Sequence, residues 1–233
     1  MSATEVVRAG DGFVDAAVAL IVERARVAQS DDGVFSMSLC GGSTPRVIYE
    51  ALVGLEAGVI DWARVRITFG DERSVPPDSD ESNYRMAREA LLDHVPIPSE
   101  NVLRIEAEDG AKVAAERCDA TMRKWAEGDG DEVFVHDLVL LGMGDDGHTA
   151  SLFPGTVALE EERRWVMENY VEKFDTHRIT LTYPVINAAR CVCFLVTGEE
   201  KKGPVVARIL EGGAGDPAAA VKPAGELIWL LGW

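Results

Sequence analysis

The chain of 233 residues carries little basic charge. It has 23 Lys and Arg residues against 40 Asp and Glu residues, which gives a formal net charge of −17 at pH 7. Nucleic acids and anionic membranes bind basic surfaces, and no cluster of Lys and Arg supplies such a surface here. We therefore expect neither as a partner. An anionic ligand would need basic side chains gathered in one pocket.

Long hydrophobic runs and patterned cysteines are also missing. The apolar stretch at residues 16–22 is too short to cross a membrane, and it continues directly into Glu23 and Arg24. The four cysteines show neither metal-binding nor redox spacing, so we expect free, buried thiols. With 47% hydrophobic residues the composition is ordinary, and together these features favour a cytoplasmic globular protein.

Strand-like and helix-like segments alternate along the chain. Strands are predicted at residues 34–40, 65–69, 102–105, 138–143, 191–197 and 227–231. Helices are predicted at residues 13–28, 44–55, 83–92, 111–126 and 201–210. This alternation predicts a single α/β domain over residues 1–233, with a mostly parallel, Rossmann-like sheet flanked by helices on both faces.

Four of the predicted strands end in loops that are rich in glycine or polar residues. These loops follow Cys40, Phe69, Met143 and Thr197. The carboxyl ends of parallel strands lie at one edge of a sheet, where open α/β folds bind their ligands. We therefore expect residues that are far apart in the sequence to converge on one crevice.

The glycine-rich loop at residues 142–155 carries the strongest chemical signal. Its glycines permit a tight turn, and the imidazole of His148 is suited to moving protons near neutral pH. Asp145, Asp146 and His148 are also metal-ligand types, but two adjacent carboxylates and one imidazole do not define a coordination geometry. We interpret His148 as a general base that Asp146 orients, and a metal-dependent hydrolase remains the alternative.

The loop at residues 41–45 has the composition of a phosphate cradle. Gly42 permits close approach, Ser43 and Thr44 add hydroxyl groups, and the following helix start offers free N–H groups. Thr44 is expected as the N-cap and Pro45 as the first helical residue. An ordinary capped turn is the alternative.

Charged residues elsewhere in the chain are candidates for the same pocket. Arg73 could bind an anion, and Asp71 could orient a hydroxyl group or a base. Arg178 and Lys201 could complete an anion pocket. Each of them is otherwise a solvated surface charge.

Taken together, these segments resemble the 6-phosphogluconolactonase family. The resemblance is carried in order by residues 41–45, 70–73, 82–84, 142–155, 178–182 and 198–201, and it spans nearly the whole chain. It implies the fold shared with glucosamine-6-phosphate deaminases and ribose-5-phosphate isomerases. It also implies hydrolysis of 6-phospho-D-glucono-1,5-lactone to 6-phospho-D-gluconate, in the oxidative branch of the pentose phosphate pathway, without a metal or organic cofactor.

The resemblance also implies roles for particular residues. His148 matches the general base, and Asp71 and Arg73 match an Asp-Glu-Arg loop. The sugar-phosphate loop is matched by Gly42, Ser43 and Thr44, and the basic positions on the phosphate side by Arg178 and Lys201. One segment departs from the family pattern, because residues 172–177 replace a Lys-Pro-Pro-like run before Arg178.

Two other functions stay open from the sequence. A glucosamine-6-phosphate deaminase or isomerase would use a similar pocket, and so would a non-catalytic sugar-phosphate sensor. A sensor usually carries a further DNA-binding or partner domain, for which this chain shows no basic helix. We expect a small-molecule substrate as the main partner, and a monomer or weak homodimer.

Overall fold

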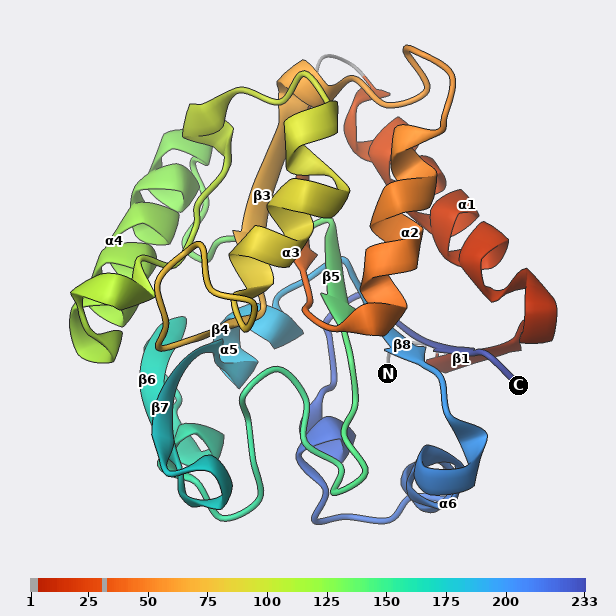
Figure 1. Ribbon diagram of the computed structural model, residues 1–233, viewed down its shortest axis with the longest axis vertical. Coiled ribbons are helices and arrows are strands. Elements are labelled where there is room, and N and C mark those ends of the chain that lie inside the picture. Colours follow the sequence, from red (N-terminus) through yellow and green to blue (C-terminus); the bar gives the residue numbers. More distant parts are fainter. Residues whose placement is uncertain (1–3, 31–32) are drawn as a thin grey trace.

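An open parallel sheet forms the centre of the computed structural model, which describes residues 4–30 and 33–233 (Figure 1). Within these residues the sheet has six parallel strands in the order β1-β9-β8-β5-β2-β3. The strands are β1 (Thr4–Arg8), β2 (Phe35–Leu39), β3 (Val65–Phe69), β5 (Leu138–Leu141), β8 (Cys191–Val196) and β9 (Glu226–Leu231). The prediction of a mostly parallel α/β sheet is confirmed.

The central strands are buried along their whole length because both faces of the sheet are covered. Every residue of β2, β5 and β8 is buried, as is typical of parallel strands that lie between layers of helices. β1 is an edge strand with mostly exposed residues, and its polar sequence did not predict it. It pairs with β9 and places β9 inside the sheet.

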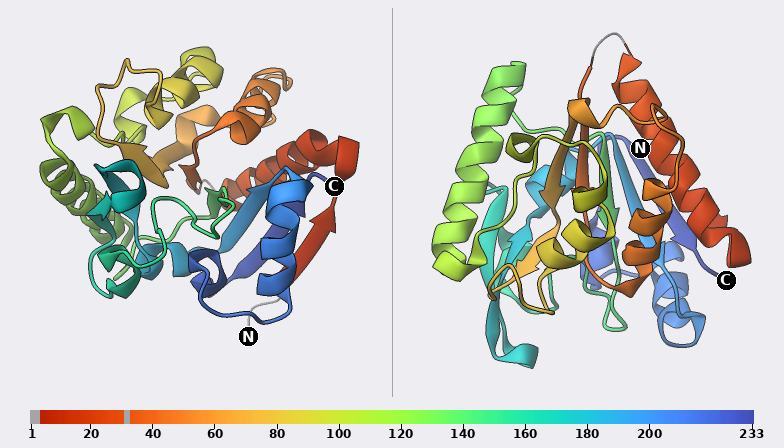
Figure 2. Two further views of the ribbon diagram at one scale, coloured as in Figure 1. Left: turned by 60° about the horizontal axis from the view of Figure 1, so that its bottom comes forward. Right: turned by 45° about the horizontal axis from the view of Figure 1, so that its top comes forward.

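Five of the helices in the described residues lie close to their predicted positions, and the short α5 was not predicted. The helices are α1 (Phe13–Ala28), α2 (Ser43–Val53), α3 (Asn83–Ala90), α4 (Ala111–Asp129), α5 (Tyr183–Asn187) and α6 (Glu199–Leu210). α1 buries Phe13, Ala17, Ile21 and Ala25, which recur every four residues along one helix face. α1 and α2 pack together on one side of the parallel sheet, and α6 lies on the other side (Figure 2).

The start of α2 differs from the prediction. The helix begins at Ser43 after Gly42, whose φ of 109° lies in a region that favours glycine. Thr44 is therefore inside the first turn and is not the N-cap. Its hydroxyl group lies 2.8 Å from that of Thr197, at the end of β8.

A second, antiparallel sheet was not predicted. It contains β4 (Asp71–Arg73), β7 (Thr176–Leu181) and β6 (Val166–Val171), and α4 packs against β6 and β7. Gly70 joins the two sheets, because its N–H donates to Leu39 and its carbonyl accepts from the N–H of Leu181. The chain therefore leaves the parallel sheet directly after β3, and the three residues of β4 are too few to show a strand pattern.

Two further expectations concern the strand predicted at residues 102–105 and the cysteines. The strand prediction is wrong, because only Val102 forms a bridge, to Ile67. All four cysteines are free and buried, as predicted. No helix among the described residues has the length and apolar character needed to span a membrane.

Candidate active site

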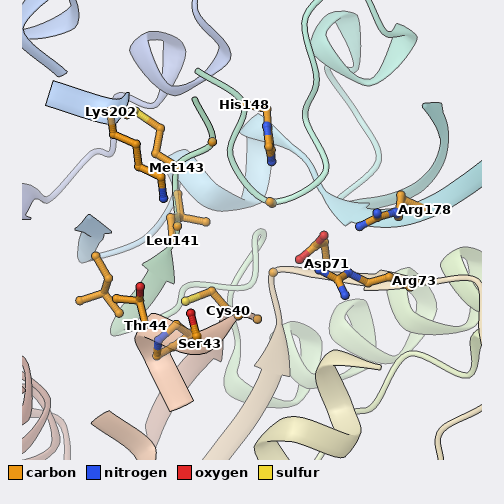
Figure 3. A pocket seen from close by; sticks show the side chains of 18 residues that line it. Cys40, Ser43, Thr44, Asp71, Arg73, Leu141, Met143, His148, Arg178 and Lys202 are labelled. Atoms are coloured by element: carbon orange, nitrogen blue, oxygen red, sulfur yellow. The ribbon is translucent and has the colours of Figure 1, made fainter. Parts of the chain in front are cut away.

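A cavity of about 300 Å³ opens at the carboxyl edge of the parallel sheet (Figure 3). It is lined by residues from the loops after β2, β3 and β5 and by residues of β8 and α6. The predicted site residues in its wall are Gly42, Ser43, Thr44, Asp71, Arg73, His148 and Arg178. The structure thus brings these residues together. The parallel strands place the loops with Gly42, Asp71 and His148 at one edge of the sheet, and the antiparallel sheet adds Arg178.

The loop after β5 holds His148 over the cavity. The carbonyl of His148 accepts a 2.9 Å hydrogen bond from the N–H of Gly144, which closes the turn. A methyl group at Gly144 would lie 2.2 Å from the imidazole ring, so only glycine leaves room for this ring. On its other side the imidazole stacks on Phe153, with ring centroids 3.9 Å apart. The ring points into the cavity (Figure 3).

The carboxylate of Asp146 holds the His148 ring through Nδ1. One carboxylate oxygen lies within hydrogen-bonding distance of His148 Nδ1 and also accepts from the His148 backbone N–H. An ionised carboxylate only accepts hydrogen bonds, so Nδ1 carries a proton, and in the neutral imidazole the free lone pair is then on Nε2. Burial raises the pKa of Asp146, but hydrogen bonds from His148 and Lys173 outweigh it and lower the pKa to about 2. The carboxylate is therefore ionised at neutral pH.

Asp71 lies in the cavity wall but belongs to a different hydrogen-bond network. Its Oδ2 accepts a 2.6 Å hydrogen bond from Ser151, and its Oδ1 accepts a 3.0 Å bond from Asn83. The structure shows no hydrogen bond between Asp71 and His148. Asp71 therefore connects the loop that carries the imidazole to β4 and α3. Ala150, beside this connection, has a φ of 47°, and strained backbone of this kind is concentrated at functional sites.

Arg73 and Arg178 lie directly opposite each other in the antiparallel pair of β4 and β7. Directly opposed like charges destabilise a sheet unless an anion lies between them. Burial, and then the charge of Arg73, lower the pKa of Arg178. Among the described residues neither guanidinium forms an ion pair with a carboxylate, although Arg73 donates to the carbonyl of Glu81. The two side chains form one cationic wall of the cavity.

The opposite wall consists of the N-terminus of α2 and a lysine of α6. Gly42, Ser43 and Thr44 lie at the positive end of the helix dipole, where anions bind. The lysine in the wall is Lys202, and the predicted Lys201 is exposed and outside the cavity. Successive residues of a helix differ by about 100° in direction. Lys201 and Lys202 therefore point in different directions from α6, and only Lys202 lines the cavity. Burial lowers the pKa of Lys202, and the charge of Asp145 partly opposes this shift.

Glu72 is a structural residue of the site that the sequence analysis missed. Its carboxylate accepts hydrogen bonds from the backbone N–H groups of Arg73, Asn83 and Tyr84 and from the hydroxyl group of Ser82. It thereby caps the start of α3 and fixes the chain on either side of Arg73. The available signal was an acidic residue before a helix. Glu72 lies 10 residues before the cap residue Ser82, which is too far for a local capping pattern.

Two other kinds of chemistry would use different residues of the site. A thiolate nucleophile would be Cys40, and a metal would bind the acidic residues beside His148. Cys40 lines the cavity, but burial raises the pKa of its thiol to about 12, so it is not a thiolate nucleophile. No three His, Cys, Asp or Glu side chains gather as metal ligands anywhere in residues 4–30 and 33–233. Asp146 is instead engaged by His148 and Lys173.

Comparisons with known proteins agree with this geometry. A family model described as glucosamine-6-phosphate isomerases/6-phosphogluconolactonase matches residues 9–229. A 6-phosphogluconolactonase of a Nostoc species is 41% identical over 91% of this chain and 88% of its own length. The human 6-phosphogluconolactonase is 41% identical over 84% of this chain and 78% of its own length.

Solved structures show the same fold. The 6-phosphogluconolactonase of Trypanosoma brucei superposes with a TM-score of 0.85 at 32% identity, over 99% of this chain and 97% of that one. The enzyme of Thermotoga maritima gives a TM-score of 0.85 at 29% identity, over 98% and 99% of the two chains. The chain therefore belongs to the family of glucosamine-6-phosphate isomerases and 6-phosphogluconolactonases.

Proposed function

We propose that this protein hydrolyses 6-phospho-D-glucono-1,5-lactone to 6-phospho-D-gluconate, with His148 as the general base. The observation that carries the proposal is the imidazole held by Asp146 over a cavity with two cationic walls. The lactone offers a matching pair of features, a phosphate at one end and an activated ester carbonyl at the other. The names of the relatives described above support this choice of substrate.

The first step is attack of water on the lactone carbonyl carbon. His148 Nε2 accepts a proton from the water as its oxygen forms the new C–O bond, and Asp146 stabilises the resulting imidazolium. The carbonyl oxygen becomes an oxyanion, and the guanidinium groups of Arg73 and Arg178 supply positive charge where it develops.

The second step is ring opening. The tetrahedral intermediate collapses, the bond between the carbonyl carbon and the ring oxygen breaks, and the ring oxygen takes the proton from the His148 imidazolium. The product forms as the open-chain carboxylic acid, which releases its proton to solvent and becomes the carboxylate, and His148 returns to its starting state. All the atoms come from the lactone and one water molecule, so the reaction requires no redox cofactor.

The phosphate is proposed to bind at the N-terminus of α2. Backbone N–H groups there, the hydroxyl group of Ser43 and the ammonium group of Lys202 offer donors to one dianion. This leaves the lactone ring between the phosphate and the two guanidinium groups, below His148. Asp71, in the same wall as Arg73, is placed to accept a hydrogen bond from a sugar hydroxyl group.

The test is acid release from freshly prepared 6-phosphogluconolactone, corrected for spontaneous hydrolysis, with and without a chelator. Glucono-1,5-lactone without the phosphate serves as the control substrate and should have a much higher KM. Ammonia release from glucosamine 6-phosphate would instead identify a deaminase, and binding without turnover would identify a sensor. Activity lost on chelation and restored by one metal would establish a metal-dependent hydrolase.

A further inference from the structure

The turn between β6 and β7 lies beside the cavity without lining it. It consists of a 3₁₀ turn at Glu172–Phe174 and of Asp175, which adopts a left-handed φ of 48°. This turn falls within residues 172–177, where the sequence departs from the family pattern. Two of its side chains contact groups of the site. Lys173 contacts Asp146, which holds His148, and Phe174 contacts Arg178, which lines the cavity.

Lys173 and His148, the proposed base, contact the same carboxylate, that of Asp146. The ammonium group of Lys173 lies 2.9 Å from Asp146 Oδ2, while Asp146 Oδ1 holds His148, and it lies 4.0 Å from Asp145. One carboxylate is thus shared between a permanent cation and the imidazole. When His148 takes a proton, the nearby ammonium charge opposes the new positive charge. Lys173 therefore favours the unprotonated imidazole, which is the form that acts as a base.

The ring of Phe174 lies against two groups of the site, the ring of Phe153 and the guanidinium group of Arg178. Its centroid lies 5.8 Å from that of Phe153, at 80° between the planes, and Phe153 stacks on His148. The guanidinium carbon of Arg178 lies 5.1 Å from the Phe174 centroid. Arg178 has Arg73 opposite it and no carboxylate ion pair in the described part of the chain. The aromatic face is therefore an attractive partner that holds this guanidinium in place.

We propose that the β6–β7 turn is a positioning element of the active site, in which Lys173 acts on His148 through Asp146 and Phe174 holds Arg178. The inference rests on the proposed role of His148 as the base. Neither side chain lines the cavity, so both act through other residues. The turn thus links the base to the cationic wall that faces it.

The first experiment compares the pH dependence of kcat/KM in Lys173→Met, Lys173→Arg and the wild type. In Lys173→Met the acid limb should move to higher pH by about half a pH unit at low salt, because the imidazolium gains stability. In 1 M salt the displacement should shrink, since screening weakens the interaction. Lys173→Arg, which retains the charge, should keep the wild-type limb.

Lys124→Met is the matched control, because Lys124 is an exposed lysine of α4. The other charged groups near the imidazole are the same in all these proteins. They are Asp145, Asp71, Arg73, Arg178, Lys202 and Asp216, the last of which is paired with Arg208. An acid limb in Lys173→Met that coincides with that of Lys124→Met, or that moves to lower pH, would overturn the role of Lys173.

The second experiment removes the aromatic face of Phe174 but keeps an apolar side chain. Phe174→Leu should lower kcat/KM about two- to fivefold, whereas Phe174→Trp should retain the wild-type value. In an Arg178→Met background Phe174→Leu should cause no further loss, because its partner is already absent. Losses that multiply independently in the double variant would show that Phe174 does not act through Arg178.

His148→Ala separates this inference from the proposed function. If His148→Ala retains wild-type turnover, the assignment of the base is wrong. If His148→Ala is inactive but the turn variants behave like Lys124→Met, only the inference about the turn fails. Lys173→Gln provides a second neutral variant in case Lys173→Met folds poorly.

Discussion

The hydroxyl group of Ser151 donates a 2.6 Å hydrogen bond to the carboxylate of Asp71, which lies 80 positions earlier in the chain. Ser151 belongs to the loop that carries His148, and Asp71 begins the strand that carries Arg73. This contact therefore sets the distance between the proposed base and one cationic wall. It also occupies one of the two oxygens of Asp71, while Asn83 occupies the other.

Replacing Ser151 by Ala should reduce stability as well as activity. Both residues are buried, so the lost hydrogen bond leaves an incompletely satisfied carboxylate, at a cost of about 1–3 kcal/mol. Urea unfolding followed by far-UV circular dichroism measures this loss. Ser99→Ala, at an exposed position, is the control. A Ser151→Ala protein with unchanged unfolding free energy would show that the contact contributes little.

Replacing His148 by Ala should lower kcat by roughly 10²–10⁴-fold, the range for loss of general-base catalysis. The measurement is initial-rate lactone hydrolysis corrected for the spontaneous reaction. His94→Ala is a suitable control because His94 is exposed, lies outside the cavity and has its ring hydrogen-bonded to the carbonyl of Glu89. Near-wild-type kcat in His148→Ala would rule out the imidazole as the base.

The neighbouring lysines of α6 provide a matched pair. Lys202→Met should raise KM about 10-fold or more, because a charge-assisted hydrogen bond to the phosphate is lost. Lys201→Met should leave KM almost unchanged, because Lys201 is exposed outside the cavity. Steady-state kinetics of the two variants decides between these positions. The reverse pattern would mean that α6 presents a different face to the substrate.

His136 should make the protein less stable in acid. Burial lowers its pKa to about 3, so the folded protein does not bind this proton until far below the ordinary pKa of 6.5. The unfolded chain binds it as the pH falls below 6.5. Stability from this group is therefore fully present above pH 6.5 and is lost as the pH falls toward 3, by roughly 5 kcal/mol at most.

The His136→Gln variant tests this pH dependence, because it removes the titrating group. Its unfolding free energy should fall less steeply than that of the wild type between pH 6.5 and 4. His94→Gln, at the exposed position, should follow the wild-type slope. Equal slopes in His136→Gln and the wild type would show that the imidazole is already protonated in the folded protein.

Much of this protein was determined by local sequence. β3 and α1 have the predicted bounds, because their apolar residues recur with the period of a strand or a helix over enough residues. The glycine-rich loops could also be placed, since glycine and polar residues end buried strands. From there the parallel arrangement alone required that Gly42, Asp71 and His148 share one edge of the sheet.

Only the tertiary structure decided which side chains complete the site. The choice of Lys202 over Lys201 depends on the rotation of α6 against the sheet, and a difference of one residue is beyond the precision of a helix boundary. The opposition of Arg73 and Arg178 and the contact of Lys173 with Asp146 depend on the second sheet. In this sheet β4 pairs with β7, which lies about 100 residues later in the chain, and no local pattern announces that pairing. Folding alone therefore brings these charges together.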